Sequence, residues 1–408
     1  MNENLFDEFP AYCAADWEEQ ILSDLKGQPK EGLNSVTEDG IKVSPNYFAT
    51  TAPIQRSFRN KAQWSIASSF SQEDCNEAIL ESLSGGCNAL IVHVKDGVDF
   101  SKIFDNVMLD IIDCTVVYHG SNLSVLEDDL SKYVQANYNN NACLHLVTDS
   151  LENTEKKAEA GNHAYVNSSV YRNAGCTAVQ EMEFALAQLT EILISNPKSV
   201  HIQIGVGPDY FCEIAKIRAF RSLIKDIADA FNWNGKFKIS ATPCTYYLST
   251  QEVNNNLLRL TTMTMSAVIG GADQIALPSF DFTDSAFSNR ITRNIQLILE
   301  QEAFLSKVND PALGAYFIEE LTRDISQLAW ANFQDIEREG GFLIALKNNT
   351  IASRISASHK KRLQQYENGK KAQIDSNTHV SQTGFSHKTW NGIKERNLSN
   401  EISQKTEQ

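Results

Sequence analysis

The sequence predicts an α/β protein built around a TIM-type (β/α)8 barrel, and three observations predict it. Short β-rich runs recur eight times along the chain. Most of them are separated by segments in which apolar residues recur at helical spacing, the pattern typical of parallel βαβ units. The chain has 408 residues, more than the roughly 250 that one barrel needs. Eight strands favour a closed barrel over an open sheet wound on both faces.

We expect three parts: an N-terminal arm over residues 1–40, the barrel over 41–346, and a polar, basic tail or linker over 347–408. In the arm, the apolar residues Trp17, Ile21 and Leu25 share one helical face, and Gly27 stops the helix. The tail holds eleven Lys and Arg against five Asp and Glu, in a chain whose net charge is −15. A docking arm, a solvated linker and a segment that folds back onto the acidic body remain open readings of this tail.

The elements follow in chain order. Strands are expected over residues 64–69, 89–94, 114–118, 143–148, 163–168, 200–205, 237–242 and 273–278. Helices are expected over residues 17–26, 73–83, 123–135, 178–194, 210–231, 251–268, 286–304, 316–336 and 351–367, with a weaker helix over 100–109. Residues 149–161 are too polar for a buried helix, and we interpret them as a loop.

Polar residues alternate along several strands, and this alternation points to the barrel interior. Side chains of a strand point alternately to its two faces. His201 and Gln203 therefore oppose Ile202, and Lys238, Ser240 and Thr242 share one face of the 237–242 strand. In the 143–148 strand, His145 lies on the face opposite Leu144 and Leu146. If the apolar faces meet the outer helices, these polar groups line the lumen. A hydrated lumen that holds a polar, elongated ligand is one reading, and a hydrogen-bonded network in a packed barrel is the other.

Composition excludes several classes of function. An acidic chain with no basic cluster in its folded part is a poor ligand for nucleic acids or anionic membranes. No apolar run reaches about 18 residues, and residues 1–10 lack the features of a secretory signal. The eight cysteines form no Cys-x-x-Cys pair, which favours reduced thiols in a cytoplasmic protein.

Isolated polar residues offer few other candidate sites. Strand histidines such as His93 and His163 have no His-x-x-x-His partner and no carboxylate cluster, so no metal site is predicted. The turn Gly205-Val206-Gly207-Pro208-Asp209 opens a helix that Asp209 caps, and its glycines fit either a phosphate site or a tight strand-to-helix turn. Glutamates on the helices expected over 178–194 and 210–231 are interpreted as solvated faces or local ion pairs; they are Glu181, Glu183, Glu191 and Glu213.

Several motifs together carry a family resemblance. Ala174-Gly175-Cys176-Thr177-Ala178-Val179-Gln180-Glu181 resembles the methylmalonyl-CoA mutase family, and so does Gly207-Pro208-Asp209-Tyr210-Phe211-Cys212-Glu213-Ile214-Ala215-Lys216. Further matches are Gly270-Gly271-Ala272-Asp273, Arg290-Ile291-Thr292-Arg293-Asn294-Ile295-Gln296 and Asp310-Pro311-Ala312-Leu313-Gly314. They occur in the family's order over roughly residues 15–375. The motif over residues 290–296 adds Asn294 and Gln296 to the candidates for the substrate channel.

The resemblance implies a barrel that threads an acyl-CoA along its axis and works with a flavodoxin-like domain that carries adenosylcobalamin. It implies a radical rearrangement between methylmalonyl-CoA and succinyl-CoA. The Asp-x-His-x-x-Gly motif of the cobalamin domain does not occur in this sequence, so we expect no such domain, no cobalamin-binding residue and no cofactor on this chain. The cofactor of the holoenzyme is expected on a partner chain.

Two positions depart from the catalytic relatives. Aligned through Leu248, Ser240 stands where they have a His that contacts the substrate thioester. The spacing from Trp64 places Arg59 where they have a Tyr over the substrate. A hydroxyl replaces neither the reach nor the charge of an imidazole, and losing such a contact lowers the rate on the order of 10²-fold. No catalytic residue is therefore assigned.

This pattern resembles the family's small-subunit branch, in which a non-catalytic barrel pairs with a large catalytic chain as a heterodimer. Two alternatives remain: a catalytic barrel whose cobalamin domain is a separate polypeptide, and an accessory paralogue that binds acyl-CoA without turnover.

Overall fold

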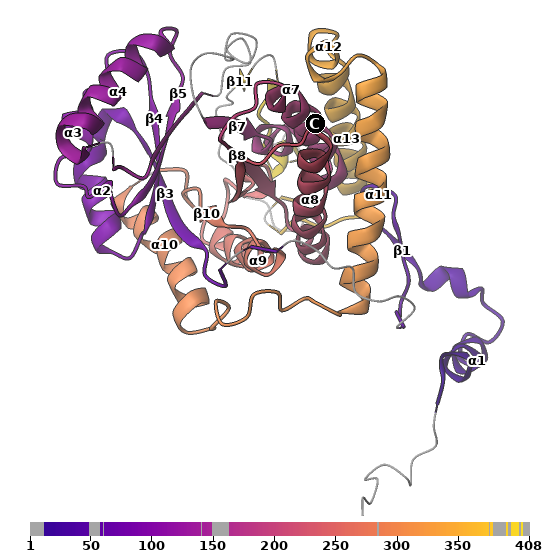
Figure 1. Cartoon of the computed structure of the whole chain (residues 1–408). Helices are drawn as coiled ribbons and strands as arrows, with labels where there is room; N and C mark the ends of the chain where they lie inside the picture. Colours follow the sequence, from indigo (N-terminus) through magenta and orange to yellow (C-terminus); the bar gives the residue numbers. More distant parts are fainter. Residues whose placement is uncertain are drawn as a thin grey trace, which may run out of the picture.

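Eight parallel strands form a nearly closed barrel at the centre of the protein, as the computed structural model shows (Figure 1). The structure describes residues 12–48, 58–59, 61–139, 141–148, 163–283, 285–374, 376–377, 389–390, 393–399 and 401–402. The strands are β3 (Ser65–Ser71), β4 (Ala89–Val94), β5 (Asp113–Tyr118), β6 (Leu144–Thr148), β7 (His163–Asn167), β8 (Ser199–Val206), β9 (Lys236–Pro243) and β10 (Gln274–Ala276). All eight expected strands are confirmed.

The strand order is β6-β5-β4-β3-β10-β9-β8-β7, so β6 and β7 are the two ends of the sheet. Every ladder between neighbours in this order is parallel. The rings of His145 and His163, one from each end strand, have centroids 4.8 Å apart. The two ends therefore meet, and the predicted (β/α)8 architecture is confirmed.

Amphipathic helices cover the outside of the barrel (Figure 1). They are α2 (Cys75–Ser84), α3 (Phe100–Ile103), α4 (Leu123–Tyr138), α6 (Ser169–Asn173), α7 (Ala178–Leu193), α8 (Tyr210–Ala230), α9 (Asn255–Gly270), α10 (Ala286–Gln301) and α11 (Tyr316–Arg338). The predicted helix over 100–109 is wrong beyond Ile103, because the chain turns at Asn106 with a φ of 58°. The predicted loop 149–161 lies outside the described residues.

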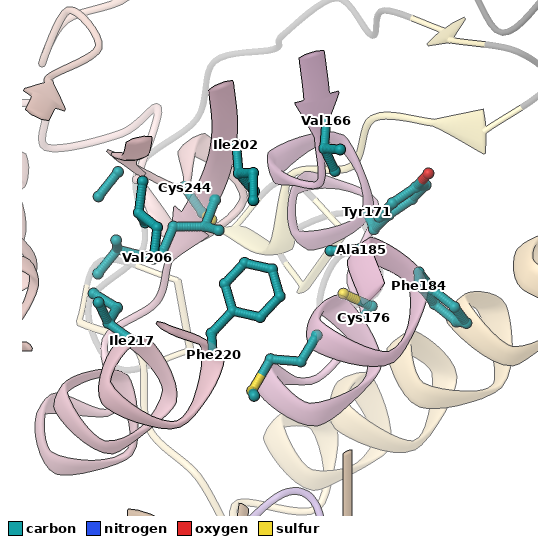
Figure 2. Close-up of a cluster of buried hydrophobic side chains, with 14 of the residues drawn as sticks. Val166, Tyr171, Cys176, Phe184, Ala185, Ile202, Val206, Ile217, Phe220 and Cys244 are labelled. Carbon is teal, nitrogen blue, oxygen red and sulfur yellow. The ribbon is translucent and has the colours of Figure 1, made fainter. Parts of the chain in front are cut away.

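The largest apolar core lies between strands β7–β9 and helices α7 and α8. Figure 2 shows side chains of the strands, such as Val166 and Ile202, meeting those of the helices, such as Phe184 and Phe220. Phe220 is 1% exposed, and burying a side chain of that size contributes roughly 1.5–3 kcal/mol. A second core holds β4 and β5 against α2, α3 and α4. These two cores hold the strands of the barrel in place from the outside.

The N-terminal arm leaves the barrel rather than joining its core. Helix α1 (Ala14–Asp24) has no buried residue and projects away from the body in Figure 1. A short 3-10 turn, Lys30–Leu33, leads to a hairpin of β1 (Ser35–Val36) and β2 (Lys42–Val43). The predicted boundary at residue 40 therefore falls inside a hairpin.

The described part of the tail folds back onto the barrel. Helix α12 (Phe342–Lys347) leads into α13 (Thr350–Glu367), whose Ile351 and Ile355 are buried in the main core. Gln373 donates a hydrogen bond to the carbonyl oxygen of Tyr247, 3.1 Å away. Two short strands follow, β11 (Thr389–Trp390) and β12 (Ile393–Lys394). Among the open readings of residues 347–408, this described part corresponds to a segment that folds back onto the body.

Candidate functional site

The lumen of the barrel is packed at its middle. Strand register turns an apolar set inward; its members are Ala67, Ala89, Ile91, Val117, Val147, Tyr165 and Ala276. All of them are buried, and they form a cluster of their own, separate from the outer cores. Space along the barrel axis is therefore filled by side chains, as in an ordinary packed barrel.

Polar residues of the lumen contact one another near the amino-terminal ends of the strands, although Asp113 Oδ1 and His145 Nδ1 have no hydrogen-bond partner among the described residues. The Lys238 ammonium donates to Asp113 Oδ2 and to Gln274 Oε1, both at 3.0 Å. His145 Nε2 lies 3.7 Å from Asp113 Oδ1. Burial lowers the pKa of His145, and the nearby Lys238 adds to this while Asp113 opposes it. The imidazole is therefore held neutral, and the group as a whole is an ion pair with hydrogen-bonded neighbours.

Further along the axis the polar pairs are buried. His201 Nδ1 lies 3.3 Å from the Thr115 hydroxyl, and burial lowers the pKa of His201 well below its usual range. The Tyr165 hydroxyl donates to Gln203 Oε1 at 2.5 Å. Ser240 is 1% exposed and accepts a hydrogen bond from Gln274 Nε2 at 3.4 Å. At this depth the polar side chains contact one another, and the buried His201 Nε2 has no hydrogen-bond partner among the described residues.

The structure brings together most of the predicted lumen residues. His145, His201, Gln203, Lys238 and Ser240 all belong to this interior network. Thr242 follows them on the same face of β9, nearer the carboxyl end, and is half-buried.

Asn294 and Gln296 do not line the lumen, contrary to expectation. Both lie on α10, which packs on the outside of the barrel (Figure 1). Gln296 accepts a hydrogen bond from Trp64 Nε1 at 3.1 Å and donates to the Ile275 carbonyl oxygen at 3.3 Å. Its amide therefore joins the helix to the outer side of β3 and β10, a structural role that the motif alone did not distinguish from a channel role.

Arg59 and Ser240 lie on opposite faces of the barrel wall. Arg59 is 3% exposed, and its Nη1 donates to the Ala272 carbonyl oxygen at 3.1 Å. Its guanidinium lies 5.8 Å from the centre of the Trp64 ring, just before β3. Burial lowers the pKa of Arg59 to about 10. The two positions singled out by the resemblance are therefore not neighbours in one pocket.

A buried network of charges lies behind the 205–209 turn. Lys216 Nζ contacts Glu181 Oε2 at 2.7 Å and Glu213 Oε2 at 2.5 Å, and Arg172 Nη2 contacts Glu213 Oε1 at 2.8 Å. Lys216 also donates to the Gly205 carbonyl oxygen. All four side chains are at most 3% exposed. The solvated-face reading is wrong for Glu181, Glu183 and Glu213, which are all buried, whereas the local ion pair is found for Glu213, which pairs with Lys216 three residues further on. The nearly all-apolar sequence of α7 around Glu181 is the signal that its carboxyl would be buried.

Opposing effects act on the charges of this network. Burial raises the pKa of Glu181, although Lys216 opposes the shift. Burial alone would raise the pKa of Glu213 too, but Lys216 and Arg172 outweigh it and lower that pKa. Likewise burial disfavours the charge on Lys216, yet both carboxylates raise its pKa. The carboxylates and the cations of the network therefore hold one another in their charged forms, most clearly at Glu213 and Lys216.

The glycines of the turn make room for this network. A Cβ on Gly207 would lie 2.6 Å from Arg172 Nη2, and one on Gly205 would lie 2.6 Å from the Arg172 Cβ. Asp209 caps α8 as predicted, accepting from the Cys212 backbone N–H at 3.4 Å. Close packing against Arg172 explains both glycines without a phosphate.

No group of three or more metal-ligating side chains occurs among the residues that the structure describes. His93 Nδ1 and His119 Nε2 approach to 2.8 Å near the carboxyl end of β4, and the Ser69 hydroxyl lies 3.1 Å from His93 Nε2. Within the described ranges, no helix combines the length and apolarity needed to cross a bilayer.

Comparisons with known proteins identify the family. Residues 122–407 match the family model described as methylmalonyl-CoA mutase. The chain is 31% identical to a "Methylmalonyl-CoA mutase small subunit" of Porphyromonas gingivalis, with 89% of this chain and 69% of the relative covered. It is 24% identical to the protein of the same name from Propionibacterium freudenreichii, with 90% and 68% covered. A "Methylmalonyl-CoA mutase" of Rhizobium meliloti is 29% identical, with 61% and 41% covered. The chain therefore belongs to the methylmalonyl-CoA mutase family.

Proposed function

We propose that this chain is a non-catalytic small subunit that supports a large catalytic chain in an adenosylcobalamin-dependent mutase. The complex would interconvert methylmalonyl-CoA and succinyl-CoA, an isomerase reaction. The packed lumen is the observation that carries this proposal. Threading an acyl-CoA along the barrel axis needs a continuous passage, but Ile91, Val117 and Tyr165 fill the axis and Ser240 is sealed from solvent.

The carboxyl ends of the strands support placing the cofactor on the partner chain. Arg362 of α13 donates to the carbonyl oxygens of Gly175 and Cys176, 2.8 and 3.2 Å away, and pairs with Glu38 of the β1–β2 hairpin at 2.7 Å. Tail and hairpin thereby cover the ends of β7–β9. A flat corrin ring stacked on this end of the barrel would have to displace these contacts, so the residues present do not fit the cofactor.

Helix α1 supports association with a protein partner. Trp17, Ile21 and Leu25 form its apolar stripe, and none of them is buried in this chain. Trp17 has an edge contact with Phe48, with ring centroids 5.7 Å apart. An isolated helix of this length has marginal stability in water. We therefore expect the apolar stripe to be buried against another chain.

The eight cysteines support a cytoplasmic location for the complex. All of them are free thiols, and free thiols without disulfides are typical of reducing compartments.

Two other functions predict different binding behaviour. A catalytic barrel with its cobalamin domain on a separate chain would turn over substrate once that domain is added. An accessory paralogue would bind acyl-CoA without turnover. Isothermal titration of the purified chain with succinyl-CoA distinguishes these from a supporting scaffold, for which we expect no binding.

Co-purification tests the proposed assembly. The tagged chain is co-expressed with the large mutase subunit of the same organism. We expect one stable complex with equal amounts of both chains. Migration of the two chains as separate species, under conditions where each is folded, would contradict a subunit role.

A further inference from the structure

A serine and two histidines lie at the carboxyl end of the barrel, one layer above the side chains that fill its axis. Ala67, Ile91 and Val117 belong to that apolar filling, and they come from the neighbouring strands β3, β4 and β5 (Figure 1). Each is followed two positions later by a polar residue on the same face; the three are Ser69, His93 and His119. The backbone N–H of His119 donates to the Val94 carbonyl oxygen at 2.9 Å, so the ladder between β4 and β5 continues to this residue.

These three polar side chains form one chain of hydrogen bonds. The Ser69 hydroxyl lies 3.1 Å from His93 Nε2, and His93 Nδ1 lies 2.8 Å from His119 Nε2. The centres of the two imidazole rings are 5.1 Å apart, and their planes are inclined by 16°. That separation is the largest that a 2.8 Å contact between these two nitrogens permits, so the contact lies along the line that joins the rings. The geometry is that of a straight N–H···N hydrogen bond.

The same geometry does not suit a metal ion shared by the two histidines. A zinc ion binds imidazole nitrogen at about 2.0–2.1 Å, and the lone pairs of its ligands converge on it. Here the two nitrogens face each other directly across 2.8 Å, which leaves no room for an ion between them. The pair therefore shares a proton.

The layer is accessible from the carboxyl end of the barrel. Hairpin and tail cover the ends of β7–β9, which lie across the barrel from β3–β5. Ser69 and His119 are exposed, and His93 is half-buried. The Lys95 backbone N–H donates to Gln72 Oε1 at 2.7 Å, which joins the segments that follow β4 and β3 beside the layer. The three side chains thus lie on firmly held backbone at the end where β/α barrels carry their active sites.

We propose that Ser69 is a nucleophile toward small activated esters, with His93 as its general base and His119 as the residue that positions His93. A nucleophile within hydrogen-bond reach of a base, which a third group orients, is the arrangement that activates a serine hydroxyl. His93 donates from Nδ1 to His119, and its Nε2 lone pair then accepts from the Ser69 hydroxyl. The inference is independent of the proposed subunit role, because ester cleavage needs neither cobalamin nor a large subunit.

The surroundings of His119 favour its role as the acceptor. Desolvation by neighbouring residues lowers the pKa of His119, although part of the side chain is exposed, and the positive charge of Lys95 lowers it further. A neutral imidazole keeps one nitrogen that can accept, whereas an imidazolium has only donors. His119 can therefore hold His93 in the tautomer that leaves Nε2 open to the serine.

Acyl transfer through this layer needs no co-reactant other than water. The Ser69 oxygen bonds to the acyl carbon while its proton moves to His93 Nε2, and the carbonyl electron pair moves onto the carbonyl oxygen. The carbonyl then re-forms, the bond to the leaving alkoxide breaks, and His93 gives the alkoxide its proton. Water repeats both steps with Ser69 as the leaving group, which releases the carboxylic acid and restores the serine.

Reaction of the full chain with p-nitrophenyl acetate tests the inference. We expect a burst of p-nitrophenolate of about one equivalent per chain, the sign of an accumulating acyl-enzyme, and an acetyl group on Ser69 by peptide mass spectrometry. Ser69→Ala should remove the burst and lower the rate by about 100-fold or more. Ser71→Ala is the matched control, since Ser71 is exposed on the same strand, and it should leave the burst unchanged. A burst that survives Ser69→Ala, or no acetyl group on Ser69, would overturn the proposal.

Two substitutions at His119 distinguish positioning from a merely structural role. His119→Ala removes the acceptor and should lower kcat by about tenfold or more with KM unchanged, the loss expected for a hydrogen bond to a charged group. His119→Gln offers an amide oxygen to His93 Nδ1 and should restore most of the rate. Circular dichroism confirms that each variant is folded. Wild-type activity in His119→Ala, or an equal loss in both variants, would overturn the role given to His119.

Discussion

Four charged side chains in the interior, Arg172, Glu181, Glu213 and Lys216, show how much a single residue can matter for this fold. Their charges sum to zero, and each has an opposite charge within 2.8 Å. A buried charge is tolerated only with such partners, since an unpaired one is strongly unfavourable. The network is therefore a weak source of net stability but a sensitive point for substitution.

Lys216→Met should destabilise the chain by about 3–5 kcal/mol, because it leaves Glu181 and Glu213 buried without their shared cation. Urea unfolding at pH 7 measures the change. Lys225→Met is the matched control: Lys225 is exposed on the same helix, and its replacement should change the free energy of unfolding by less than about 0.5 kcal/mol. Equal effects of the two variants would contradict the role given to the buried pair.

Glu183 predicts a pH dependence of stability. Burial raises the pKa of its carboxyl to about 7, and hydrogen bonds from Asn332 and Arg354 only partly offset this. A raised folded-state pKa means that the folded state binds more protons, so this group's contribution is full below about pH 4.5 and is lost as the pH rises to about 7. Glu183→Gln should therefore stabilise the protein at pH 8, by up to about 3 kcal/mol, and little at pH 5.

Urea unfolding of wild type and Glu183→Gln at both pH values checks this difference. Gln keeps an acceptor for the Asn332 amide, which donates to Glu183 Oε2 at 2.7 Å. If Glu183→Gln stabilises the protein no more at pH 8 than at pH 5, the prediction is contradicted. The charged carboxylate would then be stabilised by Asn332 and Arg354 enough to offset its burial.

At the scale of elements, the periodicity of apolar residues predicted the strands and the long helices. The eight strands and the long helices were predictable because alternation and helical spacing extend over many residues. The five-residue helix α6 was not, since so short an element has no period to detect. The apolar sequence of α7 does indicate that Glu181 is buried, but the burial of Glu213 against Arg172 and the outward place of Gln296 depend on contacts between elements distant in sequence.

Strand β9 allows a test of the packed lumen. Ser240→His introduces a larger ring where the native side chain is 1% exposed. We expect destabilisation of about 1–3 kcal/mol from overpacking and no mutase activity. Thr242→His, on the same face of β9 but half-exposed near the carboxyl end, should be tolerated better. Equal stability of the two variants in urea unfolding would indicate free space beside Ser240.

Helix α1 allows a test of partner binding. Ile21→Glu places a charge in the apolar stripe and should weaken association with the large subunit by tenfold or more, about 1.4 kcal/mol. Because no residue of α1 is buried in this chain, the unfolding temperature of the isolated chain should not change. Ser23→Glu, off the stripe, serves as the control in the same titration. An Ile21→Glu variant that binds like wild type would remove α1 from the interface.

At the scale of the whole molecule, the protein keeps a complete barrel, and we proposed its non-catalytic role from two features of that barrel. The axis is filled by side chains, and the hairpin and tail cover the ends of β7–β9. The family could be inferred from the sequence because its motifs are local. The filling of the barrel axis and the covering of its carboxyl end could not, because they result from apolar side chains of six strands and from a tail whose composition resembles that of a linker.

Mutase activity of the purified chain, of the large subunit, and of the two combined is the most direct measurement of the central claim. Each is assayed with methylmalonyl-CoA and adenosylcobalamin. We predict no turnover by this chain alone and full turnover only when both chains are present. Conversion of methylmalonyl-CoA to succinyl-CoA by this chain with adenosylcobalamin, in the absence of the large subunit, would contradict the account.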